Sequence, residues 1–428
     1  MENNFFDTFN INKGIFDFVC NCENELKESF LEFEPIAFYN QMKILKSMQD
    51  NNLKSTDFNW TTGYGYGDEG RDKVEKIYAN IFNTEDALVR PNIVSGTHAI
   101  SLALKSILAK GDELMYISGA PYDTLRKVIG IDGNEPGNFI ESGISYSQVD
   151  LIDGKINIEK TIEMISENTK VIAIQRSTGY SNRKAFTTDE LKIVIKSIKE
   201  KYPEVIVFVD NCYGEFTDYE EPTDFGADYM AGSLIKNPGG GLAYSGGYIV
   251  GKQDLIDRIS NNLTAPGIGK ECGLSFGMTR QILQGLFMAP RVVEDAIKVA
   301  RLFSLAFEKL GYNTLPKSSD KRSDIIASIE LNDPKLLEVF CGSIQSASPV
   351  DHQFTPKAWD MPGYENKVIM AAGGFIEGSS IELSADGPMR TPYYVYFQGG
   401  LSYYHGKYAL INVLNNFKEQ IHNLKNKM

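Results

Sequence analysis

Two short apolar runs, each ending on a residue able to do chemistry, constrain the fold of this chain most strongly. Residues 205–209 form a continuous run rich in β-branched side chains, which is typical of a strand buried on both faces of a parallel sheet. That run ends on Asp210. A second run, 229–235, ends on Lys236 and leads into the loop Asn-Pro-Gly-Gly-Gly at 237–241. Because open α/β sheets bind ligands at the carboxyl ends of their strands, Asp210 and Lys236 are predicted to share a ligand site.

This acid and this lysine are the pair that pyridoxal phosphate (PLP) chemistry needs. A carboxylate keeps the pyridine nitrogen protonated so that the ring accepts electrons, and a lysine forms a Schiff base with the aldehyde. Taken singly, Asp210 could merely cap a turn and Lys236 could be a solvated loop lysine. The pair together with the glycine loop predicts a PLP enzyme in which both residues are catalytic.

The stretches VDNCYGEF (209–216), GSLIKNPGGG (232–241) and GGYIVG (246–251) resemble the fold-type-I PLP enzymes of cysteine and methionine metabolism. Among these, the chain most resembles the methionine γ-lyase-like proteins that are called aluminium-resistance proteins, and the resemblance extends from about residue 59 to about residue 401. It implies an α/β fold with a large, doubly wound, mostly parallel sheet and a smaller carboxyl-terminal α+β domain.

The same resemblance implies a PLP-dependent carbon–sulfur lyase. Such an enzyme acts on a sulfur-containing amino acid, as methionine γ-lyase and cystathionine β- or γ-lyase do, and releases a thiol, a 2-oxo acid and ammonia. Enzymes of this family are typically homotetramers built from dimers with shared sites, so a homotetramer is expected here. The expected ligand, apart from the cofactor, is a small amino-acid substrate.

Composition argues against several other classes of protein. A net charge of −13 is not that of a nucleic-acid binder, which would carry a basic face. No apolar run approaches the ~20 residues of a membrane span, and the first residues lack the pattern of a signal peptide. The 5 cysteines are scattered and odd in number, which suits reduced thiols in a cytoplasmic protein, and the 4 histidines leave little material for a metal site.

The pattern along the chain predicts three parts: an amino-terminal helical arm over 1–55, a PLP-binding domain over 56–287 and a small domain over 288–428. In the middle part, apolar strands alternate with helical segments such as 189–201, which favours a doubly wound sheet. A long amphipathic helix is predicted over 288–310. Strands of the small domain are predicted near 325–331, 368–371 and 380–383.

The phosphate of the cofactor is predicted to lie at Ser95, Gly96 and Thr97. An apolar strand enters this Ser-Gly-Thr sequence and an Ala/Leu-rich helix follows, so free backbone N–H groups and the positive end of the helix dipole would meet the anion. The simpler reading is a Ser/Thr helix cap. Ser233 offers a further hydroxyl, whereas Ile235 stands where related enzymes have a phosphate-binding threonine.

The resemblance assigns three tyrosines and one arginine to the cofactor. Tyr122, in a Pro-Tyr sequence before a helix, would stack on the pyridine ring and could protonate the departing sulfur, although simple packing is the alternative. Tyr64, Tyr66 and Arg71 are candidates for a loop that reaches the cofactor phosphate of the neighbouring subunit. Their spacing is longer than in the family, and a Gly/Tyr turn ahead of a helix remains an alternative for the tyrosines.

Three arginines are predicted to meet the substrate. Arg176 and Arg183 lie in a loop after an apolar strand, where better-known lyases have an acidic residue and an Asn-Pro pair. This loop is expected over the phenolic side of the cofactor, where one of its residues would touch either O3′ or the substrate carboxylate. Arg390 follows Asp-Gly-Pro-Met in the last third of the chain, and by resemblance it would hold the α-carboxylate in a bidentate pair. An ordinary surface arginine is the alternative for Arg390.

Two rival functions stay open at this level. Other fold-type-I PLP enzymes, such as aminotransferases or enzymes of the threonine-aldolase type, share the acid, the lysine and the phosphate loop. A PLP-binding metal-resistance protein with low turnover is the second rival, and the departures at Ile235 and Arg176 keep it open.

Overall fold

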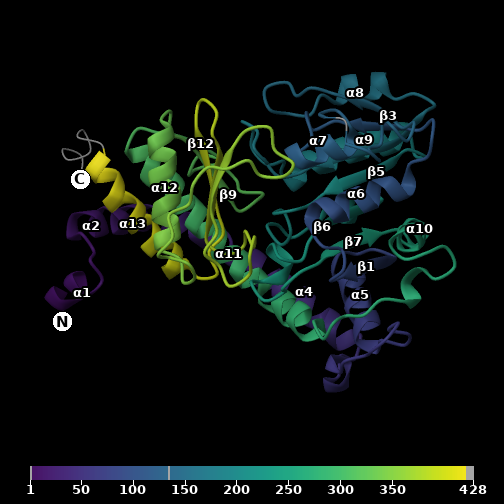
Figure 1. Ribbon diagram of the computed structural model, residues 1–428, viewed down its shortest axis with the longest axis horizontal. Helices are drawn as coiled ribbons and strands as arrows, with labels where there is room; N and C mark the ends of the chain where they lie inside the picture. Colours follow the sequence, from purple (N-terminus) through teal and green to yellow (C-terminus); the bar gives the residue numbers. More distant parts are fainter. Residues whose placement is uncertain (1, 134, 421–428) are drawn as a thin grey trace. The chain divides into compact units, whose positions relative to one another are not determined.

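The computed structural model describes residues 2–133 and 135–420, and its ribbon is drawn in Figure 1. The chain forms two compact units. One contains residues 39–290, and the other combines the described residues up to Phe38 with those from Arg291 onward. The predicted amino-terminal arm is therefore divided between the units, and the second division falls three residues beyond the predicted limit at 287.

The unit of residues 39–290 is built on a sheet of seven strands among the described residues, in the order β1-β7-β6-β5-β4-β2-β3. Strands β2 to β6 pair in parallel, and β7 runs antiparallel to both of its neighbours, β6 and β1. The predicted large, mostly parallel sheet is confirmed. The strands are β1 Asp86–Arg90, β2 Glu113–Tyr116, β3 Ser145–Gln148, β4 Thr169–Gln175, β5 Ile206–Asp210, β6 Tyr229–Ser233 and β7 Gly247–Gly251.

Helices surround this sheet, as Figure 1 shows for α5, α6, α9 and α10. Buried side chains of α6 and α10, among them Ala103, Leu104 and Ile256, form one core with apolar strand residues such as Leu88 and Phe208. The helices are α4 Glu34–Asp50, α5 Glu69–Ile81, α6 Gly96–Ile107, α7 Asp123–Ile129, α8 Ile158–Met164, α9 Thr188–Lys201 and α10 Gln253–Leu263, with 3-10 turns at Ser55–Phe58, Pro222–Phe225, Asn237–Gly239 and Gly269–Glu271.

Helix α11, Thr279–Lys309, is longer than the predicted helix over 288–310 and contains Pro290. Proline lacks the backbone N–H, so the sequence favours a start near it. Buried Ile282, Leu283 and Leu286 nevertheless extend the apolar side of the helix by more than two turns before the proline. None of the helices formed by residues 2–133 and 135–420 is long and apolar enough to cross a membrane.

The second unit packs helices against an antiparallel sheet of five strands in its described part, in the order β10-β11-β12-β9-β8. Phe303 of α11 stacks on Phe397 of β12, with ring centroids 3.8 Å apart, inside a large apolar core. The elements are α1 Glu2–Thr8, α2 Lys13–Glu25, α3 Lys27–Leu31, β8 Asn313–Leu315, β9 Ile326–Glu330, α12 Pro334–Ser346, β10 Val368–Ala371, β11 Ser384–Pro388, β12 Tyr394–Gln398 and α13 Tyr403–Gln420.

The strand predicted over 380–383 is wrong, because the strand, β11, begins only at Ser384. Its sequence Ser-Ala-Asp-Gly-Pro is typical of a turn. Pairing with β10 on one side and β12 on the other supplies the backbone partners that override this local preference. The strands predicted near 325–331 and over 368–371 correspond to β9 and β10.

Candidate active site

Asp210 and Lys236 lie at the same edge of the large sheet. Asp210 is the last residue of β5, and Lys236 follows β6, which pairs with β5 in parallel so that Asp210 is opposite Ala231. The Asp210 side chain is 6% exposed, and its Oδ1 accepts a 3.1 Å hydrogen bond from the backbone N–H of Cys212. The alternation of buried strands and connections therefore brings the predicted acid and the predicted lysine to one place.

The electrostatic environment couples these two residues. Burial raises the pKa of the Asp210 carboxyl, and the positive charge of Lys236 opposes that rise. Burial alone would lower the pKa of the Lys236 ammonium, but the ionisable groups around it outweigh burial and raise this pKa. Those groups are Cys212, Tyr213, Asp210 and Glu215. The lysine is consequently held in its charged form among acidic neighbours.

Helix α6 begins next to this lysine. The Ser95 side chain caps the helix by accepting a 3.0 Å hydrogen bond from the backbone N–H of His98, and Thr97 Oγ1 lies 2.9 Å from Thr124 Oγ1. A Cβ added to Gly96 would lie 3.4 Å from the Cβ of Ser233 and 4.0 Å from Nζ of Lys236. Gly96 and Ser233 therefore lie close to Lys236, and the glycine leaves the place between them free of a side chain.

Tyr122 lies beside the loop that follows β4. Its backbone N–H donates a 2.9 Å hydrogen bond to Oε1 of Gln175, and its ring centroid lies 5.5 Å from that of Tyr180. Gly179 approaches the same ring, because a Cβ there would be 3.2 Å from a ring carbon of Tyr122. Tyr122 is therefore held between its own helix and the 177–183 loop.

Arg176 binds protein groups in the interior. Its Nη1 donates a 2.8 Å hydrogen bond to Asn211 and lies 3.5 Å from Glu221, and its Nη2 donates to Thr217. Arg176 and Glu221 are each about 1% exposed, so this is a buried ion pair. The predicted contact of Arg176 with substrate stays a prediction, and this geometry does not favour it.

Arg183 is also buried, and it stabilises its own loop. Its Nη2 donates to the backbone carbonyls of Gln175 and Ser177, and its Nη1 donates to that of Lys184. The guanidinium also stacks on the ring of Phe186, 4.3 Å from the centroid. These contacts give Arg183 a structural part, while its predicted contact with substrate likewise stays a prediction.

Arg71 ties two loops together. It is 3% exposed, and its Nη1 donates hydrogen bonds of 2.8 Å and 3.1 Å to the carbonyls of Gly65 and Gly273, while Asp72 pairs with its charge. Tyr64 and Tyr66 stand on the first of these loops and are 72% and 64% exposed. The buried arginine therefore supports this loop, whereas the two tyrosine side chains extend into solvent.

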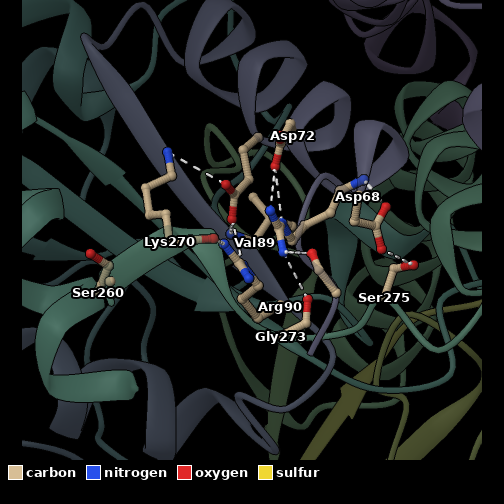
Figure 2. A network of polar contacts seen from close by, with 12 residues as sticks. Asp68, Asp72, Val89, Arg90, Ser260, Lys270, Gly273 and Ser275 are labelled. Atoms are coloured by element: carbon tan, nitrogen blue, oxygen red, sulfur yellow. Dashed lines mark hydrogen bonds and ion pairs between the residues drawn. The ribbon is translucent and has the colours of Figure 1, made fainter. Parts of the chain in front are cut away.

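A buried ion pair reinforces this region, as Figure 2 shows around Arg90, Val89 and Lys270. Nε of Arg90 lies 2.6 Å from Oε1 of Glu75, and both side chains are at most 2% exposed. Arg90 also donates to the carbonyls of Lys270 and Cys272, so the end of β1 is joined to the 270–273 segment. Sequence reasoning assigned no role to this pair.

Arg390 belongs to the other unit. It lies two residues after β11, in the short connection to β12, and it is exposed. Its backbone carbonyl accepts a 2.8 Å hydrogen bond from the N–H of Tyr393, which closes a turn. The predicted grip of Arg390 on a substrate carboxylate remains a prediction.

Sequence reasoning missed two side chains that surround Lys236. Nζ of Lys236 lies 4.0 Å from the centroid of the Tyr213 ring. Glu215 is fully buried, accepts a 2.6 Å hydrogen bond from the hydroxyl of Tyr248, and has its pKa raised to about 8 by burial. Their position three and five residues after Asp210 was the available signal.

In this mostly parallel sheet, an acid, a lysine and the amino terminus of a helix come together at the carboxyl ends of the strands. This arrangement defines a class of protein, the fold-type-I PLP enzymes. Distant solved structures agree with this fold. The PLP-dependent protein YhfS of Escherichia coli superimposes with a TM-score of 0.60 at 16% identity, covering 90% of this chain and 96% of that chain.

The chain belongs to the methionine gamma-lyase family, whose sequence model matches residues 15–418. It is 49% identical over 391 residues to the uncharacterized protein YnbB of Bacillus subtilis (strain 168), which covers 91% of this chain and 93% of that protein. The predicted family is confirmed, and with it the class of PLP-dependent carbon–sulfur lyases.

Two solved structures are similar over almost their whole length. One is a carbon-sulfur lyase involved in aluminium resistance from Clostridium novyi NT, with a TM-score of 0.93 and 45% identity, covering 97% of this chain and 98% of that chain. The other, from Clostridium acetobutylicum, is a candidate cystathionine beta-lyase involved in aluminium resistance, with a TM-score of 0.93, 47% identity and the same coverage.

Proposed function

We propose that this chain binds PLP at Lys236 and cleaves a carbon–sulfur bond of a sulfur-containing amino acid, releasing a thiol, a 2-oxo acid and ammonia. The observation that carries the proposal is the convergence of Lys236, Asp210 and the start of α6. Family membership supports the lyase class. The name of the Clostridium acetobutylicum relative supports cystathionine as a substrate, and that of the Clostridium novyi relative supports cleavage of a carbon–sulfur bond.

The residues around Lys236 fit this cofactor. The amino terminus of a twelve-residue helix suits a phosphate, and Gly96 lets an anion approach its backbone N–H groups. Ser95, Thr97 and Ser233 add hydroxyl groups to the same place. Asp210 suits the pyridine nitrogen. Tyr122 supplies an aromatic face. Tyr64 and Tyr66 are proposed to complete the site of a second subunit, with Arg71 holding their loop in place.

The cofactor, when bound, supplies an aldehyde that reacts with amines and a ring that takes up an electron pair. The chain supplies the rest. Lys236 would hold the aldehyde until the amino group of the substrate displaces it, and the freed lysine amine would then take the proton from the substrate Cα. Asp210 would hold a proton on the pyridine nitrogen, Tyr122 would donate a proton to the departing sulfur, and Arg390 would bind and orient the α-carboxylate.

The test is an analysis of products. The purified chain, supplied with PLP, is incubated separately with L-cystathionine, L-methionine and L-cysteine, and thiol, 2-oxo acid and ammonia are measured. Equal amounts of the three products from one substrate would support the proposal. Transfer of the amino group to an added 2-oxo acid without release of thiol would indicate an aminotransferase, and PLP binding without turnover of any substrate would contradict a lyase role.

Assembly is part of the proposal. We propose a homotetramer built from dimers, in which the exposed Tyr64 and Tyr66 of one chain approach the cofactor of another. Sedimentation equilibrium of the full chain measures the oligomeric state. A monomer that retains full activity would contradict shared sites.

A further inference from the structure

The segment 211–217, which we call the strap, connects Asp210 to the surface in an unusual conformation. Tyr213 and Phe216 adopt positive φ angles of 70° and 63°. Bulky residues rarely occupy this left-handed region, because the side chain crowds the backbone, and such residues persist only where their surroundings hold them. The strap is therefore shaped by contacts beyond itself.

One buried ion pair supplies those contacts. Arg176 donates to Asn211 at one end of the strap and to Thr217 at the other. Its partner Glu221 accepts hydrogen bonds of 2.8 Å from the N–H of Phe216 and 2.9 Å from the side chain of Asn211. A charge pair placed in this way fixes both ends of the strap and one of its two left-handed residues.

The middle of the strap accommodates this ion pair closely. A Cβ on Gly214 would lie 2.6 Å from both Cδ and Nη1 of Arg176, so only glycine leaves room for the guanidinium. On the other side, the buried side chain of Asn237 donates 3.0 Å hydrogen bonds to the carbonyls of Tyr213 and Glu215. Asn237 directly follows Lys236 in the chain, so these hydrogen bonds fix the position of the strap relative to the lysine.

We propose that Tyr213 is a further catalytic residue, whose aromatic face contacts and positions the Lys236 amine, and that the Arg176–Glu221 pair is the device that positions Tyr213. This inference rests on the proposed role of Lys236. It reassigns Arg176 from the substrate to the strap, and it gives a function to the sequence Asn-Cys-Tyr-Gly-Glu-Phe after Asp210.

The physical effect of the ring follows from its quadrupole. The negative face of an aromatic ring attracts an ammonium within about 6 Å and does not attract a neutral amine to the same extent. The Tyr213 face therefore stabilises charged Lys236. The other ionisable groups around the amine are Asp210 from β5 and Cys212 and Glu215 from the strap. It also restricts where Nζ can lie, so that the amine is presented toward Gly96.

The experiment measures Lys236 in the full chain freed of cofactor, so it does not depend on turnover. Trace acetic anhydride is applied across a range of pH, and the acetylation of Lys236 is measured by mass spectrometry. Tyr213→Phe keeps the aromatic face and should match the wild type. Pentafluorophenylalanine at position 213 keeps the shape of phenylalanine but reverses the charge of the face, and it should speed labelling about 2- to 30-fold below the amine pKa.

A labelling profile of the pentafluorinated variant equal to that of Tyr213→Phe would overturn the role of the ring. Because these two side chains have nearly the same shape, the comparison isolates the charge of the ring face from its packing. If Lys236→Ala still shows the absorption band of a covalently bound cofactor, the proposed function fails instead, and the labelling result remains valid for the amine alone.

The positioning role of Arg176 has its own control. Arg176→Lys keeps the charge but loses the forked guanidinium that reaches both ends of the strap. The midpoint, meaning the pH at which Lys236 labelling is half-maximal, should therefore move toward that of the pentafluorinated variant. Arg90→Lys changes another buried, paired arginine that does not touch the strap, and it should leave the midpoint unchanged. Equal midpoints in both variants and the wild type would overturn the positioning role.

Discussion

Asp210 and Lys236 lie at the carboxyl ends of β5 and β6, two strands that pair directly and in parallel. Each residue alters the charge state of the other: the lysine lowers the pKa of the carboxyl, and the carboxyl raises that of the ammonium. This coupling underlies the first two predictions, in which one partner is removed at a time.

Lys236→Ala should abolish turnover and the absorption band of the bound cofactor while the chain stays folded, because the lysine provides both the covalent attachment and the base. Absorbance with and without borohydride reduction, together with circular dichroism, measures both effects. Lys192→Ala removes an exposed lysine paired with Glu220 and serves as the control. A borohydride-reducible band in the Lys236 variant would contradict the assignment.

Asp210→Asn should still bind PLP but lose most of its kcat, because a neutral amide does not hold a proton on the pyridine nitrogen. The amide keeps an oxygen that can accept the hydrogen bond from the N–H of Cys212, so the local fold should persist. Steady-state kinetics and cofactor titration separate the two properties. A variant with a near-normal rate would remove Asp210 from the mechanism.

Arg390→Ala should cost about 2–5 kcal/mol of transition-state stabilisation, measured as kcat/KM, because a substrate carboxylate would lose its partner. Arg390→Lys should also be strongly impaired, since lysine keeps the charge but loses the planar fork that orients Cα. L-Methionine, L-cystathionine and L-cysteine are the substrates to compare. Unchanged kcat/KM for every amino acid that is turned over would contradict this role.

Glu215 should make the stability of the chain depend on pH. Its pKa in the folded state is raised from 4.5 to about 8, so the folded state binds the proton more tightly than the unfolded state. The contribution of Glu215 to the free energy of unfolding is therefore complete below about pH 4.5 and is lost as the pH rises to about 8. Urea unfolding of wild type and Glu215→Gln between these limits measures it.

The Glu215→Gln variant should gain stability relative to the wild type as the pH rises, by roughly 1 kcal/mol per pH unit. Glutamine keeps an oxygen that accepts the hydrogen bond from Tyr248. Glu220→Gln alters an exposed carboxylate nearby in the sequence and should show no such trend. A constant difference between wild type and Glu215→Gln across this range would show that Glu215 is not protonated on folding.

Removing one partner of the Arg90–Glu75 pair should destabilise the unit of residues 39–290 by about 3–5 kcal/mol, because a buried charge would be left without its counter-charge. Glu75→Ala is the informative change, and thermal unfolding is the measurement. Lys46→Ala breaks the exposed pair with Asp50 and should cost less than about 0.5 kcal/mol. Similar losses in the two variants would contradict the importance of burial.

The sequence by itself determined the two strands that end at Asp210 and near Lys236, and the helix that begins at Gly96. Those features depend on local properties: continuous apolar runs, a serine able to cap a helix, and a glycine loop that ends an element. Such properties act within a few residues, so they can be recognised without knowledge of distant partners.

Tertiary structure decided the features that depend on pairing across long separations. β11 is a strand at a turn-like sequence because two neighbouring strands satisfy its backbone. Arg176 binds Asn211, Thr217 and Glu221, which lie 35 to 45 residues further along the chain, and it thereby shapes the strap that carries Tyr213 to Lys236. A buried guanidinium binds whichever acceptors the fold brings within reach, and only the packed chain determines which acceptors those are.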